Sequence, residues 1–398
     1  MLRLSRELDR PWVPAVFLGL AGVVLAVARL HVAGHGNVAA FILPGSNFAA
    51  AGKLPAGITT FGPHGYDGQF FYRLALSPNR LSGSVHGIVL DTPYRLERIG
   101  YPVLAWLGAA GRTGLVPWSL IGVNVAALAG LGWVGAALAG SFGRHAAWGL
   151  VLAGYWGYAY SLSRDTAEIP AAFFLLAGLL ALRRSRPVVA GLLLAASVLT
   201  RETGMAVVGA VALVTLWHTV RGPRPGRRWV VEQVAWVLPT AAFGAWVLVI
   251  RATVGANTFG TDAGANLGVP FLALVRAVHH DLATLGQRQS EIAAVEIAAL
   301  LVVGSLAAWR GWISRQRPSG SPGSDGAAVD RLAWILVVGL ALCLSGAVWS
   351  GPSNYRSLDQ MWLLDILLLL RARGRLWLPA VLAAGLWALV YVHQVVNL

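Results

Sequence analysis

Long apolar runs recur along this chain from near its N-terminus almost to its C-terminus, and they constrain its fold more than any other feature. The composition agrees with this pattern, since 57% of the residues are hydrophobic and only 12% are charged. Backbone groups inside a lipid bilayer must hydrogen-bond within the protein, so only helices and closed barrels span a membrane. The runs are continuously apolar rather than alternating, which is typical of spanning helices and not of barrel strands. The sequence therefore predicts an all-α polytopic membrane protein.

The apolar runs and their connections predict one integral membrane domain covering residues 1–398. We expect the long segment at 31–115 to form an outward catalytic loop that carries an interfacial helix. Residues 318–330, rich in Pro, Gly and Ser, predict a flexible cytoplasmic linker. We predict about eleven transmembrane helices, at residues 12–30, 116–140, 146–162, 166–183, 187–201, 204–220, 229–251, 291–309, 331–349, 357–370 and 376–396.

Basic residues cluster in short connections between the apolar runs, and the chain carries a formal charge of +14. Because membrane proteins keep such clusters on the cytoplasmic side, the pattern indicates topology, and no nucleic-acid partner is expected. The excess of Arg over Lys suggests a GC-rich bacterial genome. We therefore predict a multi-pass protein of a bacterial plasma (inner) membrane, with its N-terminus cytoplasmic and its C-terminus outside. The connections placed inside are Arg144, 183–186, 221–228, 310–317 and 371–375.

The stretch YDGQFFYRLAL at 66–76 gathers charged and aromatic residues at the start of a helical pattern. Asp67 is expected to be the N-cap of a helix lying flat at the membrane surface, and Asp is among the preferred N-cap residues. The same carboxylate, held where water meets lipid, could also act as a general base. Both interpretations stay open from the residues alone. His64 and Tyr66 are candidates to line the same pocket, although a lone His in a loop is more often polar surface.

A second stretch, DTPYRLERIGYP at 91–102, places Arg95 and Arg98 three residues apart on one helical face. Two guanidinium groups presented together match a phosphate, which Arg binds through paired donors. The alternative is an interfacial Arg pair that contacts lipid headgroups or Glu97.

Charged residues also stand at the predicted outer ends of three later spans, in the motifs SRDTAEIP, LTRETG and NYRSLDQ. Charges at this depth are costly unless they are paired or functional. One interpretation is a structural network in which Arg164 and Arg201 neutralise the acids, and the other is substrate binding. The residues concerned are Asp165, Glu168, Arg201, Glu202, Tyr355 and Arg356.

The sequence offers little support for a metal or a nucleotide. It has no Gly-rich phosphate loop, no Asp-x-Asp pair and no His-x-x-x-His pair on a predicted helix. The single cysteine, Cys343, excludes an intramolecular disulfide and a Cys-based metal site. The HHD triplet at 279–281 is a weak metal signal, because adjacent residues on a helix point apart. We therefore predict no metal and no cofactor.

The combination of a first span, an outward loop with YDGQFFYRLAL and YRLERIGYP, and spans with RDTAEIPAAFFLLAGLLALRR and ASVLTRETG resembles the bacterial membrane glycosyltransferases of the C-type fold. It is most similar to the GPI-mannosyltransferase-like and cell-surface-glycopolymer branch, over roughly residues 12–205. The resemblance implies transfer of a sugar from a polyprenyl-phosphate donor to a lipid or glycan acceptor in the cell envelope, at the outer face. The Asp of the first outer loop, here Asp67, would be the general base. Gly68 and Gln69 follow Asp67 where metal-dependent members have a second acid, which puts metal dependence in doubt.

The resulting prediction is a glycosyltransferase whose partners are the donor lipid, the acceptor and membrane lipids. Asp67 is the candidate catalytic residue. The candidate substrate- or phosphate-binding residues are His64, Tyr66, Gln69, Arg73, Tyr94, Arg95, Arg98, Asp165, Glu168, Arg201, Glu202, Tyr355 and Arg356.

Two rival functions stay open. A transporter or lipid flippase is expected to have repeated halves, broken spans and polar groups near the bilayer midplane. Charges at the outer ends and a long first loop favour an enzyme instead. A non-catalytic assembly subunit for surface polysaccharide would share the layout of the chain without needing Asp67.

Overall fold

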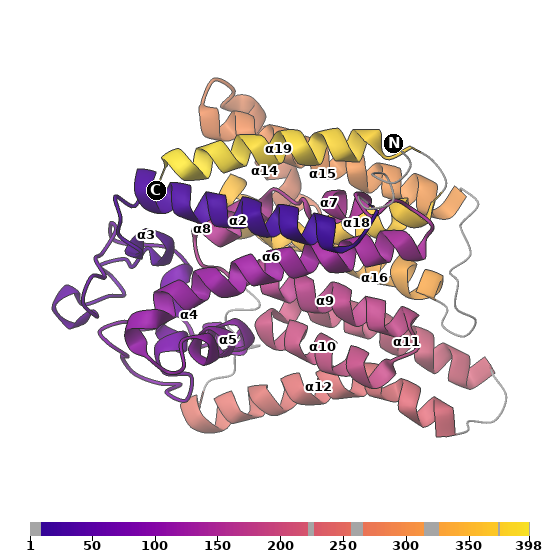
Figure 1. The fold of residues 1–398 in the computed structure, drawn as a ribbon, viewed down its shortest axis with the longest axis horizontal. Coiled ribbons are helices and arrows are strands. Elements are labelled where there is room, and N and C mark those ends of the chain that lie inside the picture. Colours follow the sequence, from indigo (N-terminus) through magenta and orange to yellow (C-terminus); the bar gives the residue numbers. More distant parts are fainter. Residues whose placement is uncertain (1–8, 222–226, 256–265, 314–325, 373–374, 398) are drawn as a thin grey trace.

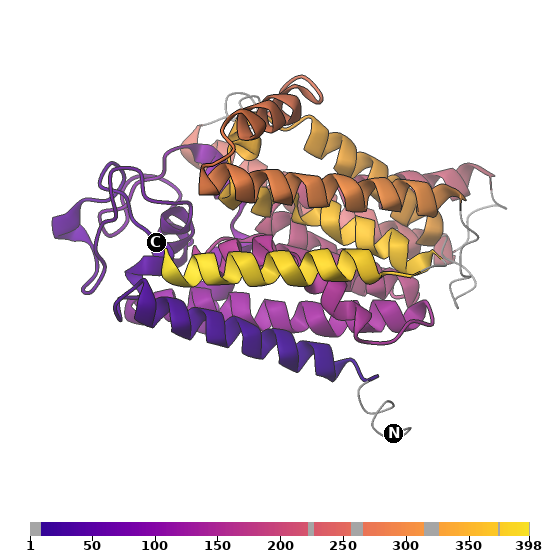
Figure 2. The same cartoon turned by 90° about the horizontal axis from the view of Figure 1, so that it is seen from above.

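A computed structural model describes residues 9–221, 227–255, 266–313, 326–372 and 375–397 of the chain. Within these residues the chain is helical and contains only isolated β-bridges, with no strand. The long helices lie side by side along one axis and form a bundle, as Figures 1 and 2 show. The prediction of an all-α fold is confirmed.

Six helices in the described part of the chain are long and apolar enough to cross a membrane. Each coincides with a predominantly apolar run, which supplies the length of about 20 residues that a bilayer core requires. They support a multi-pass membrane protein, while the count of about eleven spans stays a prediction. These helices are α2 (Trp12–Val32), α6 (Val116–Ser141), α11 (Met205–Arg221), α12 (Arg227–Val254), α15 (Arg288–Ile313) and α19 (Trp377–Val396).

Shorter helices occupy the other predicted spans. They are α9 (Glu168–Arg183), α10 (Pro187–Thr200), α16 (Gly326–Leu342), α17 (Gly346–Trp349) and α18 (Asp359–Arg371). All residues of α18 are buried, and this helix packs against α15 and α16 at the centre of the bundle. The prediction for residues 318–330 is wrong in part, because 326–330 begin α16, while 318–325 lie outside the described residues.

The predicted span at 146–162 is broken into α7 (Trp148–Ala153) and α8 (Gly157–Ser163). Gly157 permits a close approach at the break, since a Cβ there would lie 2.8 Å from the Cα of Arg356. The 3₁₀ segment η5 (Pro352–Leu358) therefore packs directly on α8. This contact fixes the position of Arg356.

Hydrogen bonds show which connections share an end of the bundle. Asp330, at the start of α16, accepts hydrogen bonds from both Arg183 and Arg371. Arg144 donates to the carbonyl of Leu370 at 3.2 Å. Three of the basic connections predicted to be cytoplasmic thus meet at one end, although which side of a membrane this end faces stays a prediction.

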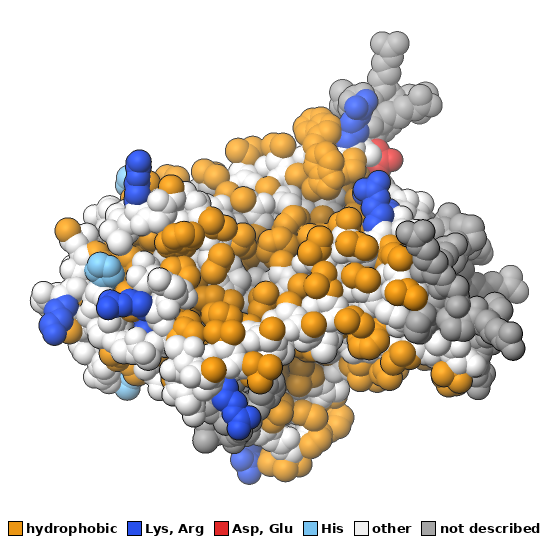
Figure 3. Space-filling view, turned by 90° about the horizontal axis from the view of Figure 1, so that it is seen from below, with side chains coloured by type: hydrophobic (Ala, Val, Ile, Leu, Met, Phe, Trp, Pro, Cys, Tyr) orange, Lys and Arg blue, Asp and Glu red, His pale blue; other side chains and the backbone are white. Residues whose placement is uncertain are grey.

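The first and last long helices run in the same direction. Arg29, near the end of α2, donates to the carbonyl oxygens of Gln394 and Asn397 at the end of α19, each at 2.7 Å. Hydrophobic side chains cover the middle of the face seen in Figure 3, with basic side chains toward its margins. This distribution matches a lipid-facing belt between two wet ends.

Residues 33–112 form a cap on the other end of the bundle (Figure 1). The cap contains α3 (Ala39–Ile42), η1 (Ala51–Lys53), α4 (Gly68–Leu76), η2 (Pro93–Glu97) and α5 (Gly100–Gly108), joined by long loops. Every residue of α4 is buried against α5, α6 and the cap loops, so the prediction of a helix lying flat on the membrane surface is wrong. Arg73 can be buried there because it donates to the carbonyl oxygens of Arg80 and Gly83 at 2.8 and 2.9 Å.

Candidate functional site

Charged side chains from five separate segments meet where the cap covers the bundle. We call this group the outer cluster. Its segments are the start of α4, the region of η2, the start of α9, the end of α10 with η4 (Glu202–Gly204), and η5. Its members are Asp67, Asp91, Arg95, Arg98, Glu168, Arg201, Glu202 and Arg356.

Asp67 immediately precedes α4, but its side chain makes no capping hydrogen bond. Its Oδ1 lies 2.9 Å from Nη2 of Arg95, and its Oδ2 accepts a hydrogen bond from Nη2 of Arg356. The prediction that the Asp67 side chain caps the helix is therefore wrong. Two guanidinium groups are stronger partners for a carboxylate than backbone amides are.

Gly68 fixes the backbone beside Asp67. A Cβ at Gly68 would lie 2.4 Å from the carbonyl oxygen of Arg164, and 2.9 and 3.0 Å from those of Ile42 and Phe41. Only a residue without a side chain fits among three carbonyl oxygens at such distances. The Asp-Gly pair thus places the carboxylate at a rigid point of the cap.

The two arginines determine the acidity of Asp67. Burial alone would raise the pKa of Asp67, but the charges of Arg95, Arg356 and Arg98 outweigh burial and hold this pKa well below its ordinary value. Asp67 is therefore ionised at neutral pH. It is also a weak base for as long as both neighbouring guanidinium groups remain in contact with it.

The outer cluster has a rim that water reaches and a buried floor. The rim consists of Asp67, Asp91, Arg95, Arg98 and Glu202, whose side chains are 13–25% exposed. The floor consists of Glu168, Arg201 and Arg356, whose side chains are 3–6% exposed. A dissolved ligand therefore meets the rim first.

On the rim, each arginine faces a carboxylate through two donors. Arg95 donates to Asp91 from Nε at 3.1 Å and from Nη2 at 2.9 Å, and its guanidinium lies 4.7 Å from the centre of the Phe70 ring. Arg98 donates to Glu202 from Nε at 2.9 Å and from Nη2 at 2.8 Å. The Tyr94 hydroxyl also donates to Glu202.

Arg356 joins the floor to the rim. Its Nε lies 3.1 Å from Oε1 of Glu168, an oxygen that also accepts a hydrogen bond from Arg201. Its Nη1 donates to the Tyr66 hydroxyl at 3.0 Å. The other carboxylate oxygen of Glu168 accepts from Ser161 at 2.8 Å. The floor is thus a buried and extensively paired network.

Several predicted site residues lie outside the outer cluster. His64 is exposed, and Gln69 ties the cap together by donating to the His64 carbonyl at 2.9 Å and accepting from the Gly45 amide at 2.9 Å. Arg73 donates to cap carbonyls, and the Tyr355 hydroxyl donates to the carbonyl of Trp349 inside the bundle. These side chains hold the structure around the site and do not face it.

Asp165 is also separate from the cluster. It is fully buried, adopts a left-handed backbone with φ of 46°, and accepts no hydrogen bond from the described residues. Burial raises the pKa of Asp165 well above its ordinary value, against an opposing effect from Arg29. A buried side chain without a hydrogen bond from the described residues and away from the rim does not fit a substrate-binding role.

The sequence reasoning missed Asp91, Ser161 and Thr166 as members of the site or its support. Thr166 lies 3.3 Å from Nε of Arg356 and shares a hydrogen bond with Ser161. The signal for Asp91 was present, since it stands four residues before Arg95, a spacing that brings charged side chains together on a turn. Ser161 and Thr166 carry no comparable signal.

The described residues contain no group of three or more His, Cys, Asp or Glu side chains that could hold a metal ion. The acids of the outer cluster face arginines instead.

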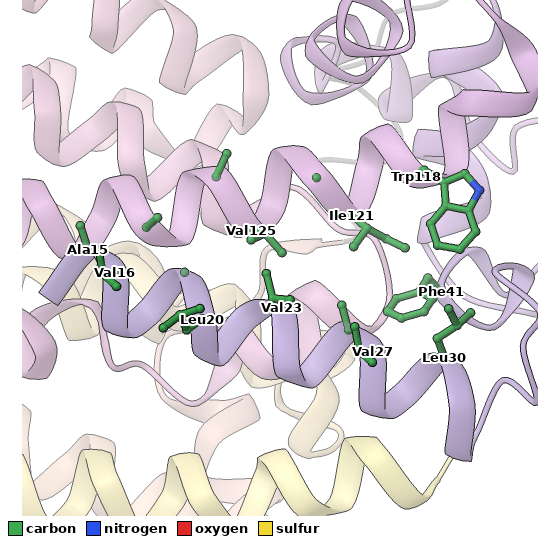
Figure 4. A pocket seen from close by; sticks show the side chains of 15 residues that line it. Ala15, Val16, Leu20, Val23, Val27, Leu30, Phe41, Trp118, Ile121 and Val125 are labelled. Atoms are coloured by element: carbon green, nitrogen blue, oxygen red, sulfur yellow. The ribbon is translucent and has the colours of Figure 1, made fainter. Parts of the chain in front are cut away.

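An apolar groove of about 680 Å³ lies between α2 and α6 and ends close to the site. Figure 4 shows side chains of the two helices along the groove, with Phe41 and Trp118 at one end. The carbonyl of this same Phe41 lies against Gly68, next to Asp67. The groove between two candidate spans thus ends at a residue whose backbone lies against the Asp67–Gly68 pair.

Comparison of the chain with protein-family models, with curated proteins and with solved structures gives no match. The resemblance to C-type glycosyltransferases is therefore a prediction from the sequence.

Proposed function

We propose that this protein is a membrane glycosyltransferase that moves a sugar from a polyprenyl-phosphate donor to a cell-envelope acceptor at the outer face. The observation that carries the proposal is the contact between Asp67 Oδ1 and Arg95 Nη2, 2.9 Å apart on the rim of the outer cluster. A carboxylate that can take a proton thus stands beside a cation that can bind a phosphate. Inverting transfer from a phosphate donor requires these two groups.

In the proposed reaction the oxygen of an acceptor hydroxyl attacks the anomeric carbon of the donor sugar. The hydroxyl proton passes to Asp67, and the bond between the anomeric carbon and the phosphate oxygen breaks. The electron pair of this bond leaves with the polyprenyl phosphate. Arg95 and Arg98 stabilise the charge that develops on the phosphate, and Arg356 holds Asp67 in position from below.

The groove between α2 and α6 supports a lipid-linked donor. Its lining is apolar along the length of both helices, and its end at Phe41 lies beside the Asp67–Gly68 pair. A polyprenyl tail in this groove would remain in the hydrocarbon layer while its phosphate reached the rim. Burial of apolar tail carbons would then contribute to binding at about 25 cal/mol per Å².

The test is sugar transfer by purified protein from synthetic short-chain prenyl-phosphate sugars to extracted envelope lipids. Asp67→Asn removes the proton acceptor and retains the size of the side chain, so turnover should fall about 100-fold or more. Asp9→Asn is the matched control, because Asp9 lies at the other end of the bundle beside His145. Donor-dependent transfer by wild type that survives in a folded Asp67→Asn protein would remove the proposed base.

One chemical control belongs to this test. Asp67→Asn creates an Asn-Gly dipeptide, which can deamidate and restore Asp. Intact mass should therefore be measured before and after each assay, and Asp67→Ala should be tested in parallel. Both substitutions should give the same loss of turnover.

A second candidate function, movement of a substrate across the membrane, is favoured by two carboxylates buried inside the bundle. Glu296 on α15 accepts a hydrogen bond from the Tyr160 hydroxyl at 3.3 Å, and Asp365 on α18 accepts one from the Trp334 indole. Ionisable groups inside membrane helices often mark transport paths. If the protein is a transporter, Glu296→Gln and Asp365→Asn should abolish flux in liposomes. If it is a transferase, both folded variants should retain sugar transfer.

A further inference from the structure

We propose that Asp91 is an internal competitor for the donor phosphate, occupying the binding face of Arg95 until the donor displaces it. This inference rests on the proposed function, because it assumes that Arg95 receives a phosphate. It assigns to Asp91 a role in donor affinity that the chemistry of transfer does not require.

The geometry of Arg95 is the first argument. The Nε and Nη2 atoms of Arg95 form the edge of the guanidinium that binds planar anions through two parallel hydrogen bonds. Asp91 occupies this edge with both carboxylate oxygens, at 3.1 and 2.9 Å. A phosphate that binds Arg95 in the same bidentate way must take the place of Asp91.

The weakness of this pair is the second argument. Asp91 precedes η2 by two residues, its side chain is 24% exposed, and Arg95 is the donor to its carboxylate among the described residues. Exposed ion pairs of this kind contribute little to the stability of a protein. A phosphate can therefore replace Asp91 at low cost.

The corresponding pair on Arg98 is built differently. Glu202 comes from a distant segment, is 16% exposed, and accepts a third hydrogen bond from Tyr94. Opening this pair would separate η2 from the end of α10. Arg95 is thus the arginine of the rim that can exchange partners, while Arg98 is fixed.

The exchange of Asp91 for a phosphate on Arg95 takes place beside the candidate base, Asp67. The same Nη2 of Arg95 that contacts Asp91 lies 2.9 Å from Asp67. A donor phosphodiester on this atom carries one negative charge, as the Asp91 carboxylate does, so the exchange leaves the charge that faces Asp67 unchanged and Asp67 stays ionised. The ring of Phe70, 4.7 Å away, would hold the guanidinium in place during the exchange. Donor binding would then leave the base free to take the proton of the acceptor.

The test measures binding of a short-chain prenyl phosphate without sugar, and of inorganic phosphate, to purified protein in detergent. Asp91→Asn removes the competing charge, so it should tighten binding of both probes by about 2- to 5-fold, the equivalent of one exposed ion pair. Arg95→Gln should weaken binding by about 10- to 100-fold. An equal gain for both probes would show that Asp91 competes with the phosphate group itself and not with the lipid tail.

The double variant separates competition from a general effect of charge. If Asp91 acts through Arg95, the gain from Asp91→Asn should disappear when Arg95→Gln is also present. A gain that persists in the double variant, or unchanged affinity in Asp91→Asn alone, would overturn the inference and leave the phosphate site in place. Absence of binding to wild type, or equal binding to wild type and Arg95→Gln, would instead overturn the proposed phosphate site.

Discussion

Replacing Arg356 should destabilise the protein more than replacing any rim residue of the outer cluster. Arg356 is 4% exposed and donates to a carboxylate on each side, Asp67 and Glu168, as well as to Tyr66. Removing one partner of a buried ion pair typically costs about 3–5 kcal/mol. In Arg356→Gln both acids keep one arginine, Arg95 and Arg201, so we expect about 3 kcal/mol.

This cost converts into a shift in melting temperature. An unfolding entropy of roughly 2.1 cal/mol/K per residue gives roughly 0.8 kcal/mol/K for a chain of 398 residues. A loss of about 3 kcal/mol then lowers Tm by about 4 °C. Arg95→Gln is the matched control, because its side chain is 18% exposed and its pairs should contribute about 1 kcal/mol or less, a shift of roughly 1 °C.

The chain provides its own reporter for this measurement. Its single cysteine, Cys343, follows α16 and is partly buried, so its reaction with a fluorogenic maleimide should accelerate when the bundle opens. Melting curves of wild type, Arg356→Gln and Arg95→Gln can be recorded without introducing a label. The division into floor and rim is wrong if Arg356→Gln has the same melting temperature as wild type. It is also wrong if Arg95→Gln loses more stability than Arg356→Gln.

Two further predictions concern topology and pH. Ser84 in the cap and Ser185 at the other end of the bundle are both exposed, so a cysteine at either position is accessible from its own side of the membrane. In a Cys343→Ala background, Ser84→Cys should react with an impermeant maleimide in intact cells and Ser185→Cys should not. The reverse labelling would refute the predicted orientation. The folded pKa of Asp67 lies below its ordinary value of 3.8, so its ion pairs should stabilise the protein fully above about pH 5 and lose this effect as the pH falls below about 4. The free energies of unfolding of wild type and Asp67→Asn should therefore differ by a constant amount at high pH and become equal in acid. A difference that already disappears between pH 7 and 5 would contradict the assignment.

The sequence predicted the ends of most helices because long apolar runs are interrupted by charge. Helix α10, predicted at 187–201, is observed at Pro187–Thr200, and α6, predicted at 116–140, ends at Ser141. The break between α7 and α8 was missed, because its residues are as apolar as a continuous span. Only the tertiary contact between Gly157 and Arg356 gives the break a role.

The sequence also predicted that Asp67, Arg98 and Glu202 would share one end of the bundle, because charges are expelled to span ends. It could not predict their partners. Capping of a helix by Asp contributes only about 1 kcal/mol. An ion pair with an arginine that tertiary packing brings close can therefore replace the capping hydrogen bond. The sequence also did not reveal the burial of α4. The charged side chain of Arg73 can be buried because it donates to carbonyl groups of the loop that follows α4, and the residue pattern does not show how this loop folds back.

The three backbone carbonyls around Gly68 bear on how this region tolerates mutation. A saturation library should find Gly68 among the least replaceable positions of the cap for expression and folding, since even Ala would force a backbone segment to move by more than a side-chain rotation can relieve. The neighbouring Asp67, 25% exposed and still facing two arginines, should accept many replacements in a selection for folded protein. Comparison of such a selection with one for growth on the envelope product would separate the two adjacent positions, with Gly68 depleted in both and Asp67 depleted only where the product is required.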